Sequence, residues 1–255
     1  MSGAILAIDA GNTRIKWGVH DAGAWTATGA LATAEAASLH DALKGALPVS
    51  RAIACNVAGA QVGAHIEAAC RRAGVAVEVI ASRREQLGVS NGYREPAQLG
   101  ADRWAALVAA HRGFEGHKLV VNVGTALTVD ALAADGRFLG GLIVPGPALM
   151  RRSLGMGTAG LRHTEGALRE FPRSTPDAIT SGAIQASVGA IARLAQAMDA
   201  HGCPAGRIIL SGGGAREIAA SLPLPAIHQD NLVLDGLIAI ARGSEPFQAK
   251  KGTEQ

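Results

Sequence analysis

Aromatic side chains and cysteines are scarce in this chain of 255 residues. Aromatic residues make up only 3% of it, so the core must be built from small aliphatic side chains at close backbone approach. The three cysteines, Cys55, Cys70 and Cys203, match no zinc or redox spacing, and their odd number argues against a disulfide framework. We therefore expect a reducing compartment, the cytoplasm.

Long apolar runs and concentrated positive charge are also missing. No stretch of about 18 uninterrupted apolar residues occurs, and the first residues carry no basic leader. The net charge is only +3, and the basic residues are scattered rather than gathered into a stripe with aromatic residues between them. We therefore expect no membrane span, no export and no nucleic acid as a partner.

Apolar material and glycine are plentiful, at 48% hydrophobic residues and 33 glycines, which excludes disorder and small disulfide scaffolds. Short apolar runs alternate with alanine-rich stretches of helical spacing, a pattern typical of an α/β fold with partly parallel strands. Strands are expected at 5–8, 14–19, 52–57, 75–80, within 119–132, at 137–144 and at 207–210. Helices are expected at 34–47, 61–73, 103–111, 175–200, 215–221 and 232–241, and an irregular loop at 82–98.

A short pattern occurs twice, half a chain apart. Residues 8–13 and 121–125 each read as an apolar strand that ends in Asp or Asn and continues through a small residue and glycine to threonine, with Asn12 between the glycine and the threonine of the first copy. A single copy is explained equally well by an ordinary hairpin turn, because Gly and Asx are the standard turn formers. Two copies predict duplicated halves that face one another. We expect two domains, at 1–115 and 116–245, and a polar tail at 246–255.

The two glycine-threonine turns suit phosphate binding. Without a Cβ, backbone N–H groups can approach phosphate oxygens, and the threonine hydroxyl adds a donor. Asp9, just before the first turn, suits Mg²⁺, which prefers carboxylate, water and phosphate oxygens. Lys16 offers a cation on the returning strand, although an exposed hairpin lysine explains it equally well. Asp130 is a second candidate carboxylate for the metal.

Asp102 and Arg103 lie where a glycine-containing loop turns into an alanine-rich helix. Asp102 can simply cap that helix, a contribution of about 1 kcal/mol. The more specific interpretation is chemical. A carboxylate at this position can accept a proton from a substrate hydroxyl, while the guanidinium binds a carboxylate through two hydrogen bonds.

Two further glycine patterns carry less weight. The Ser-Gly-Gly-Gly run at 211–214 follows a strand and precedes a helix, where a nucleotide can pass close to the backbone, but such turns are common in α/β proteins. Gly155, Gly157 and Gly160 match G-x-G-x-x-G without a preceding strand or an acidic ribose partner, which argues against a dinucleotide fold. No P-loop motif occurs, so a P-loop enzyme is not expected.

In combination, these motifs resemble the type III pantothenate kinase family, whose members are also called Bvg accessory factor homologues. The resemblance covers nearly the whole chain. It rests on DAGNTRIKWGV at 9–19, Tyr93, LGADRWAAL at 99–107, NVGTALTVD at 122–130, GGLIVPGPALM at 140–150 and SGG at 211–213. It implies an α/β fold of the actin, sugar kinase and Hsp70 ATPase type, with two ribonuclease-H-like domains and ATP in the interdomain cleft. It also implies transfer of the γ-phosphoryl group of ATP to the primary hydroxyl of pantothenate, giving 4'-phosphopantothenate in the first step of coenzyme A biosynthesis.

The resemblance further implies roles for single residues. Asp102 matches the proton acceptor of the family. The implied ATP contacts are Asp9, Ala10, Gly11, Asn12, Thr13, Arg14, Ile15, Lys16, Thr125, Ser211, Gly212 and Gly213. The implied pantothenate contacts are Tyr93, Gly100, Ala101, Asp102 and Arg103, with Thr180 contributed across a homodimer interface and Thr158 lining the same pocket.

One position departs from the pattern of that family. Its second phosphate motif commonly begins with an aspartate that binds an activating monovalent cation such as K⁺ or NH₄⁺, and here the residue is Asn122. An amide oxygen brings no net charge, so we expect weakened or absent cation dependence. Two rival functions stay open: another small-molecule kinase of the same superfold, and an ATP-binding regulatory protein without catalysis.

Overall fold

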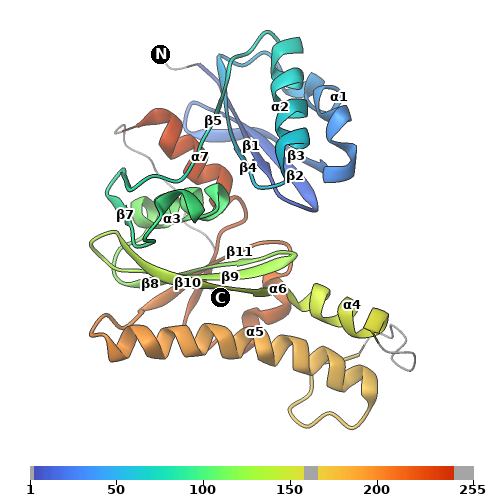
Figure 1. Ribbon diagram of the computed structural model, residues 1–255, viewed down its shortest axis with the longest axis vertical. Helices are drawn as coiled ribbons and strands as arrows, with labels where there is room; N and C mark the ends of the chain where they lie inside the picture. Colours follow the sequence, from blue (N-terminus) through green and yellow to red (C-terminus); the bar gives the residue numbers. More distant parts are fainter. Residues whose placement is uncertain (1–2, 158–165, 244–255) are drawn as a thin grey trace. The chain divides into compact units, whose positions relative to one another are not determined.

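The computed structural model describes residues 3–157 and 166–243, and the chain divides into two compact units (Figure 1). Unit 1 takes the chain up to Phe114 and includes it again from Asn231, whereas unit 2 comprises Glu115–Asp230. None of the helices in the described ranges is both long and apolar enough to cross a bilayer. The expected tail at 246–255 lies outside the described residues.

A five-stranded sheet forms the centre of unit 1, in the order β3-β2-β1-β4-β5. Its central strand β1 runs antiparallel to β2 and parallel to β4. Five of the six residues of β1 are buried, as expected of a strand with helices over both faces. The strands are β1 (Ile5–Ala10), β2 (Arg14–Asp21), β3 (Ala24–Ala32), β4 (Arg51–Asn56) and β5 (Val77–Val79).

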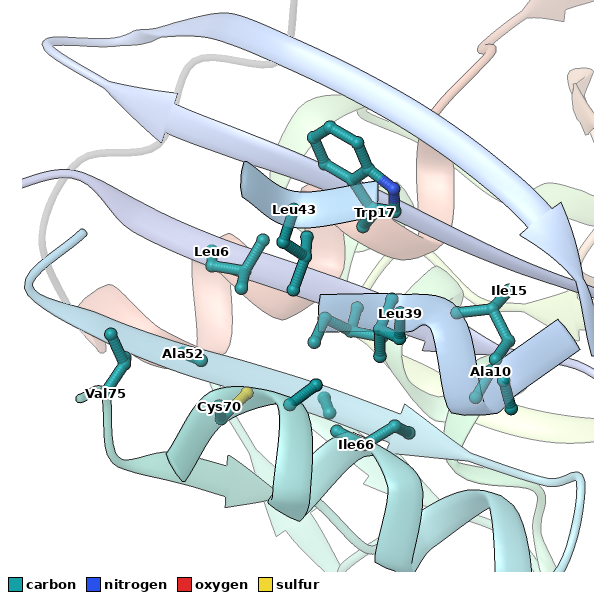
Figure 2. Close-up of a cluster of buried hydrophobic side chains, with 14 of the residues drawn as sticks. Leu6, Ala10, Ile15, Trp17, Leu39, Leu43, Ala52, Ile66, Cys70 and Val75 are labelled. Carbon is teal, nitrogen blue, oxygen red and sulfur yellow. The ribbon is translucent and has the colours of Figure 1, made fainter. Parts of the chain in front are cut away.

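Helices cover both faces of this sheet (Figure 1). α1 (Leu39–Leu43) and α2 (Ala60–Arg72) lie on one face, and α3 (Ala101–Gly113) and α7 (Leu232–Arg242) lie on the other. Figure 2 shows the apolar cluster under α1 and α2, which includes Leu6, Leu39 and Ile66. The loop between β5 and α3 contains a short antiparallel pair, β6 (Glu85–Gln86) and β7 (Val89–Asn91).

The last helix, α7, belongs to unit 1, where it packs against α3 and β1. The two helices touch through backbone, because a Cβ on Gly236 would lie 1.9 Å from the carbonyl oxygen of Ala105. The indole N–H of Trp25 donates a 3.0 Å hydrogen bond to the buried carboxylate of Asp235. The compact units therefore differ from the expected segment 116–245, because the chain returns to the first sheet after completing the second.

Unit 2 is built on a second sheet, whose strands within the unit follow the order β12-β11-β8-β9-β10. They are β8 (Lys118–Val123), β9 (Ala126–Leu132), β10 (Arg137–Pro145), β11 (Arg207–Ser211) and β12 (Ala226–His228). The helices are α4 (Pro147–Gly157), α5 (Thr175–Ala200) and α6 (Ala215–Ile218). α5 packs against β9 and β10, and its Ile184 and Ile191 enter the core of the unit.

The two units repeat one pattern of strand pairing. β1 and β8 each run antiparallel to the following strand and parallel to a later one, β4 or β11. In these parallel pairs Asp9 lies opposite Cys55, and Asn122 lies opposite Ser211. The duplication predicted from the two short sequence patterns is confirmed in the topology.

One expected helix is broken. Residues 34–47 form a 3₁₀ turn (Thr33–Ser38), the short α1 and a second 3₁₀ turn (Lys44–Ala46). Glu35 has φ −100° and ψ 16°, which lie outside the α-helical range, so its backbone interrupts the helical path.

Candidate active site

The turn between β1 and β2 lies at the end of the central strand of unit 1. The amide of Gly11 donates to the carbonyl of Arg14 at 3.1 Å, and the Thr33 hydroxyl donates to the Gly11 carbonyl at 2.7 Å. A Cβ on Gly11 would meet nothing closer than 3.3 Å, so the fold would need only a small adjustment to accept a side chain there. A glycine that the fold hardly requires leaves the backbone open to a ligand.

The other residues of this motif divide between the core and the surface. Asn12, Thr13 and Arg14 are exposed, and Lys16 is half-buried. Ala10 and Ile15 are buried in the apolar cluster under α1 and α2, so they can meet a ligand only through their backbone.

Asp9 lies on the face of β1 opposite that cluster. Successive side chains of a strand point to opposite faces, and because Ala10 enters the cluster, Asp9 faces the side of α3. The thiol of Cys55 donates a hydrogen bond to Asp9 Oδ1 at 3.3 Å. Burial raises the pKa of that thiol well above its usual range, so Cys55 stays protonated and keeps its role as donor.

The environment of Asp9 disfavours its negative charge. Burial and then the charge of Asp102 raise the pKa of Asp9 to about 6, while the Cys55 hydrogen bond and the charge of Lys16 lower it. The net effect favours the protonated form, and the added positive charge of a divalent cation would stabilise the carboxylate. Asp9 therefore fits the expected Mg²⁺.

A metal at Asp9 would need ligands from outside the protein. Within residues 3–157 and 166–243, no three His, Cys, Asp or Glu side chains gather closely enough to hold an ion. Mg²⁺ usually keeps several waters and binds through one or two carboxylates plus substrate phosphates. Asp130, the second candidate carboxylate, is buried at 1% exposure within β9 of unit 2.

Asp102 is the second residue of α3, on the same face of the sheet as Asp9. It is not the N-cap, which is Gly100, but its Oδ1 accepts the amide hydrogen of Arg103 at 2.8 Å. A Cβ on Gly100 would lie 2.5 Å from that Oδ1, so the glycine gives the carboxylate its place. Asp102 is partly exposed, and its negative charge contributes to the raised pKa of Asp9.

Arg103 and Tyr93 form the second pair of the site. Arg103 is buried at 6% exposure, and its Nη1 donates to the Tyr93 hydroxyl at 3.0 Å. The guanidinium carbon also lies 5.7 Å from the centre of the Tyr93 ring. A buried guanidinium fixed in this way, next in sequence to Asp102, can bind an anionic group of a substrate. Ala101 is the first residue of α3, directly after Gly100 and before Asp102, and it is partly buried.

The second glycine-threonine turn lies between β8 and β9 in unit 2, and glycines of two other segments pack against it. A Cβ on Gly146 would lie 2.1 Å from the carbonyl oxygen of Gly124, and the Gly146 amide donates to the Thr125 carbonyl at 2.8 Å. Gly212 has φ +100°, and a Cβ there would lie 2.4 Å from the carbonyl oxygen of Val123. Gly124 and Thr125 are themselves exposed, so the turn is packed against glycines on one side and accessible on the other.

The Ser211–Gly213 segment therefore touches the same turn. Ser211 is buried at 4% exposure opposite Asn122, and Gly213 is exposed with no atom within 4 Å of an added Cβ. Asn122 is half-buried. Unit 2 thus brings together the predicted Asn122, Thr125 and glycine-loop residues.

The two remaining predicted contacts are less informative. Thr180 is buried at 8% exposure in α5, where Asp177 and Ser181 accept the amide hydrogens of Ala167 and Arg169, respectively. Thr158 lies outside the described residues. Two residues of the site carry no signal of their role in the sequence: Cys55, which only the parallel register of β1 and β4 brings to Asp9, and Gly146, which directly follows a predicted apolar strand.

Known proteins resemble this chain over nearly its whole length. A family model described as type III pantothenate kinase matches residues 5–197. A type III pantothenate kinase of Aromatoleum aromaticum is 50% identical over 238 residues, which cover 93% of this chain and 98% of that protein. One from Dechloromonas aromatica is 42% identical, with coverage of 93% and 98%.

Solved structures share the architecture at lower identity. A candidate 2-dehydro-3-deoxygalactonokinase of Sinorhizobium meliloti has a TM-score of 0.60 and 20% identity, with coverage of 96% of this chain and 98% of that one. A candidate transcriptional activator of the Baf family from Campylobacter jejuni has a TM-score of 0.59 and 19% identity, with coverage of 93% and 97%. At these sequence identities the two structures are evidence for the fold alone. The expected fold class, the two-unit α/β arrangement of actin-like and sugar-kinase ATPases, is confirmed.

Proposed function

The chain belongs to the type III pantothenate kinase family, and from this premise we propose that Asp102, Arg103 and Tyr93 carry the acceptor side of its reaction. The enzyme phosphorylates pantothenate with ATP as the phosphoryl donor, and this reaction is a step of coenzyme A biosynthesis. The observation that supports this assignment best is the arrangement in unit 1. A partly exposed carboxylate, Asp102, is followed in sequence by the buried guanidinium of Arg103, and its negative charge acts on a second carboxylate, Asp9.

Asp102 acts as the general base. It takes the proton of the primary hydroxyl while the hydroxyl oxygen forms its bond to the γ-phosphorus and the bond from that phosphorus to the bridging oxygen of ADP breaks. Its Oδ1 is already bound to the Arg103 amide at 2.8 Å, which orients the carboxylate before substrate arrives. Little other covalent work falls to the protein, so its task is to align the groups and compensate charge.

Arg103 binds the carboxylate of pantothenate. The hydrogen bond to Tyr93, at 3.0 Å, and the ring beside the guanidinium limit its orientations, which lowers the entropy lost on binding. Gly100 and Ala101 lie at the start of the same helix, where the absent or small side chain leaves room for the substrate.

In each unit the glycine-threonine turn exposes backbone that can bind phosphate groups of ATP, and in unit 2 the Ser211–Gly213 segment lies against that turn. Asp9 would hold Mg²⁺, which neutralises phosphate charge when bound. Asn122 would contribute at most a neutral oxygen to a monovalent cation, so K⁺ or NH₄⁺ activation is weak or absent.

Kinetics of single variants test these roles. Asp102→Asn is nearly isosteric and should lower kcat by roughly 10²-fold or more, with ATP binding nearly intact, which is the usual scale of a general base. Arg103→Met should raise KM for pantothenate much more than KM for ATP. An unchanged kcat would reduce Asp102 to a residue that stabilises the start of α3, and an unchanged KM for pantothenate would remove Arg103 from the substrate site.

We also propose that the enzyme is a homodimer and works in the cytoplasm, where its three buried cysteines stay reduced. Unit 2 exposes large apolar side chains that a partner would cover, among them Ile143 at 62% and Phe171 at 79% exposure. Light scattering after gel filtration should give twice the monomer mass, and Phe171→Asp should shift the mass towards the monomer. A monomeric wild-type protein would contradict the proposal.

A further inference from the structure

Two buried polar side chains organise the loop that precedes Asp102 and Arg103. Ser82 and Asn91 are 9% and 6% exposed, respectively, in a segment that is otherwise mostly exposed. Buried polar groups remain in a fold where they are hydrogen-bonded, and such bonds specify one backbone conformation. Here they fix residues 82–99, which we call the acceptor loop.

Asn91 uses both ends of its amide. Its Nδ2 donates to the carbonyls of Arg83 and Pro96, each at 3.2 Å, and its Oδ1 accepts the amide hydrogen of Tyr93 at 3.0 Å. The side-chain amide group of Asn91 thus binds residues before and after it in the acceptor loop, and its side-chain oxygen binds the backbone of Tyr93, two positions later. One side chain therefore sets the path of the loop and the backbone of Tyr93 together.

Ser82 binds the second half of the acceptor loop. Its hydroxyl lies 2.7 Å from the carbonyls of Pro96 and Leu99, so it and Asn91 share the Pro96 carbonyl. Leu99 is buried and directly precedes Gly100 and α3. The two side chains thus connect the beginning, middle and end of the acceptor loop.

We propose that Asn91 is a positioning residue for pantothenate: it holds the backbone of Tyr93, whose hydroxyl in turn holds the Arg103 guanidinium. The proposal rests on the proposed function, in which Arg103 binds the substrate carboxylate. Asn91 touches neither Asp102 nor Arg103 by any described hydrogen bond, and its effect passes through Tyr93 at 3.0 Å on either side. Its loss should therefore weaken substrate binding and leave the ATP side unaffected.

The size of the effect follows from the geometry. Without Asn91 the loop loses three side-chain hydrogen bonds, and Tyr93 becomes free to move relative to α3. A displacement near 1 Å can cost about 10²-fold where a group must meet its partner accurately. We expect Asn91→Ala to raise KM for pantothenate by about 10-fold or more, with KM for ATP within about 2-fold of the wild type.

Tyr93 is the only tyrosine in the chain, which gives a direct readout apart from activity. Protein labelled with 3-fluorotyrosine carries a single ¹⁹F nucleus type, at this position. In the unmodified background, pantothenate should shift its resonance. In Asn91→Ala the resonance without substrate should move towards that of the free amino acid and sharpen, as expected of a ring that has lost its fixed surroundings.

The matched control is Gln98→Ala, an exposed residue of the same loop whose described hydrogen bond uses its backbone amide. It should change neither KM nor the ¹⁹F resonance. Asn91→Asp keeps the side-chain size but replaces the donating amide by a carboxylate that faces two carbonyls, and it serves if the alanine variant does not fold. It should raise KM for pantothenate as well.

The outcomes separate this inference from the proposed function. If Arg103→Met raises KM for pantothenate while both folded Asn91 variants behave like Gln98→Ala, the positioning role is wrong. An equal rise of both KM values in the Asn91 variants would show a general structural role and overturn it too. If Arg103→Met itself leaves KM unchanged, it is the proposed function that fails.

Discussion

Gly146→Ala perturbs the second phosphate turn without altering any residue that we expect to contact ATP. The added Cβ would lie 2.1 Å from the carbonyl oxygen of Gly124 and 3.0 Å from that of Thr125. Both obstacles are backbone atoms, so no side chain can rotate away. To reach even 3.0 Å, the shortest separation that real side chains tolerate, the Gly124 carbonyl must move by about 0.9 Å.

That shift is large on the scale of catalysis. A misplacement of about 1 Å remote from the chemistry can cost roughly 10²-fold in rate, because positioning supplies much of the acceleration of phosphoryl transfer. The Gly146 amide also donates to the Thr125 carbonyl at 2.8 Å, and movement of either group weakens this bond. We expect kcat/KM for ATP to fall by roughly 10²-fold.

The assay is ADP release with saturating pantothenate and varied ATP, together with a thermal melt by circular dichroism. Gly189→Ala is the matched control, since this glycine lies in α5 of the same unit and an added Cβ meets nothing within 4 Å. It should leave activity unchanged and the melting temperature equal or slightly higher. A folded Gly146→Ala enzyme with kcat/KM within about 3-fold of the wild type would refute the view that this turn must be accurately placed.

Three further predictions concern other parts of the chain. Titration with KCl should produce little activation because Asn122 brings no charge, and a strong saturable activation would refute this; Asn122→Asp should introduce or enhance it. Lys118 is fully buried, its Nζ has no hydrogen-bond partner among the described residues, and burial followed by the charge of Arg207 lowers its pKa to about 8. The unfolded chain therefore binds more protons than the folded protein between about pH 8 and 10.5, so the unfolding free energy should rise with pH over that window. Lys118→Met should abolish this slope and raise the unfolding free energy at pH 7 by about 2 kcal/mol. An unaltered urea midpoint at pH 7 would contradict this prediction. Gly236→Ala should lower the unfolding free energy by about 3 kcal/mol, because its Cβ would lie 1.9 Å from the Ala105 carbonyl, and a neutral result would show that α3 and α7 are not packed this closely.

The elements predicted well from sequence carry local signals. α5 begins where the Ser174 hydroxyl accepts the amide hydrogen of Asp177 and Pro176 occupies the first turn, and both signals can be read in the sequence. The hairpin of β1 and β2 was equally evident, because apolar alternation flanks a glycine turn.

β3 could not be predicted in this way, because its residues are mostly alanine, glycine and threonine. It is stabilised by contacts with the neighbouring strand: the Trp17 ring covers Gly29, and the Trp25 ring covers Gly18, each within 3 Å of where a Cβ would stand. Such cross-strand packing depends on register, which a local pattern does not contain.

The site shows the same division. Asp9, Asp102 and Arg103 stand out in the sequence because their residue types and glycine neighbours indicate chemistry. Cys55 and Asn91 do not, because the first acts through a parallel strand pair and the second through carbonyls that the loop folds towards it. Side chains that position others are identified by their hydrogen bonds, and those require coordinates.

We propose that this chain transfers the γ-phosphoryl group of ATP to an alcohol beside Asp102, and ³¹P NMR of the purified protein with ATP, Mg²⁺ and pantothenate can follow that transfer. We expect a phosphomonoester resonance to grow in equal amount with ADP, neither to grow without pantothenate, and Asp102→Asn nearly to abolish both. ATP that binds but stays intact, or ADP that forms without the phosphomonoester, would contradict it.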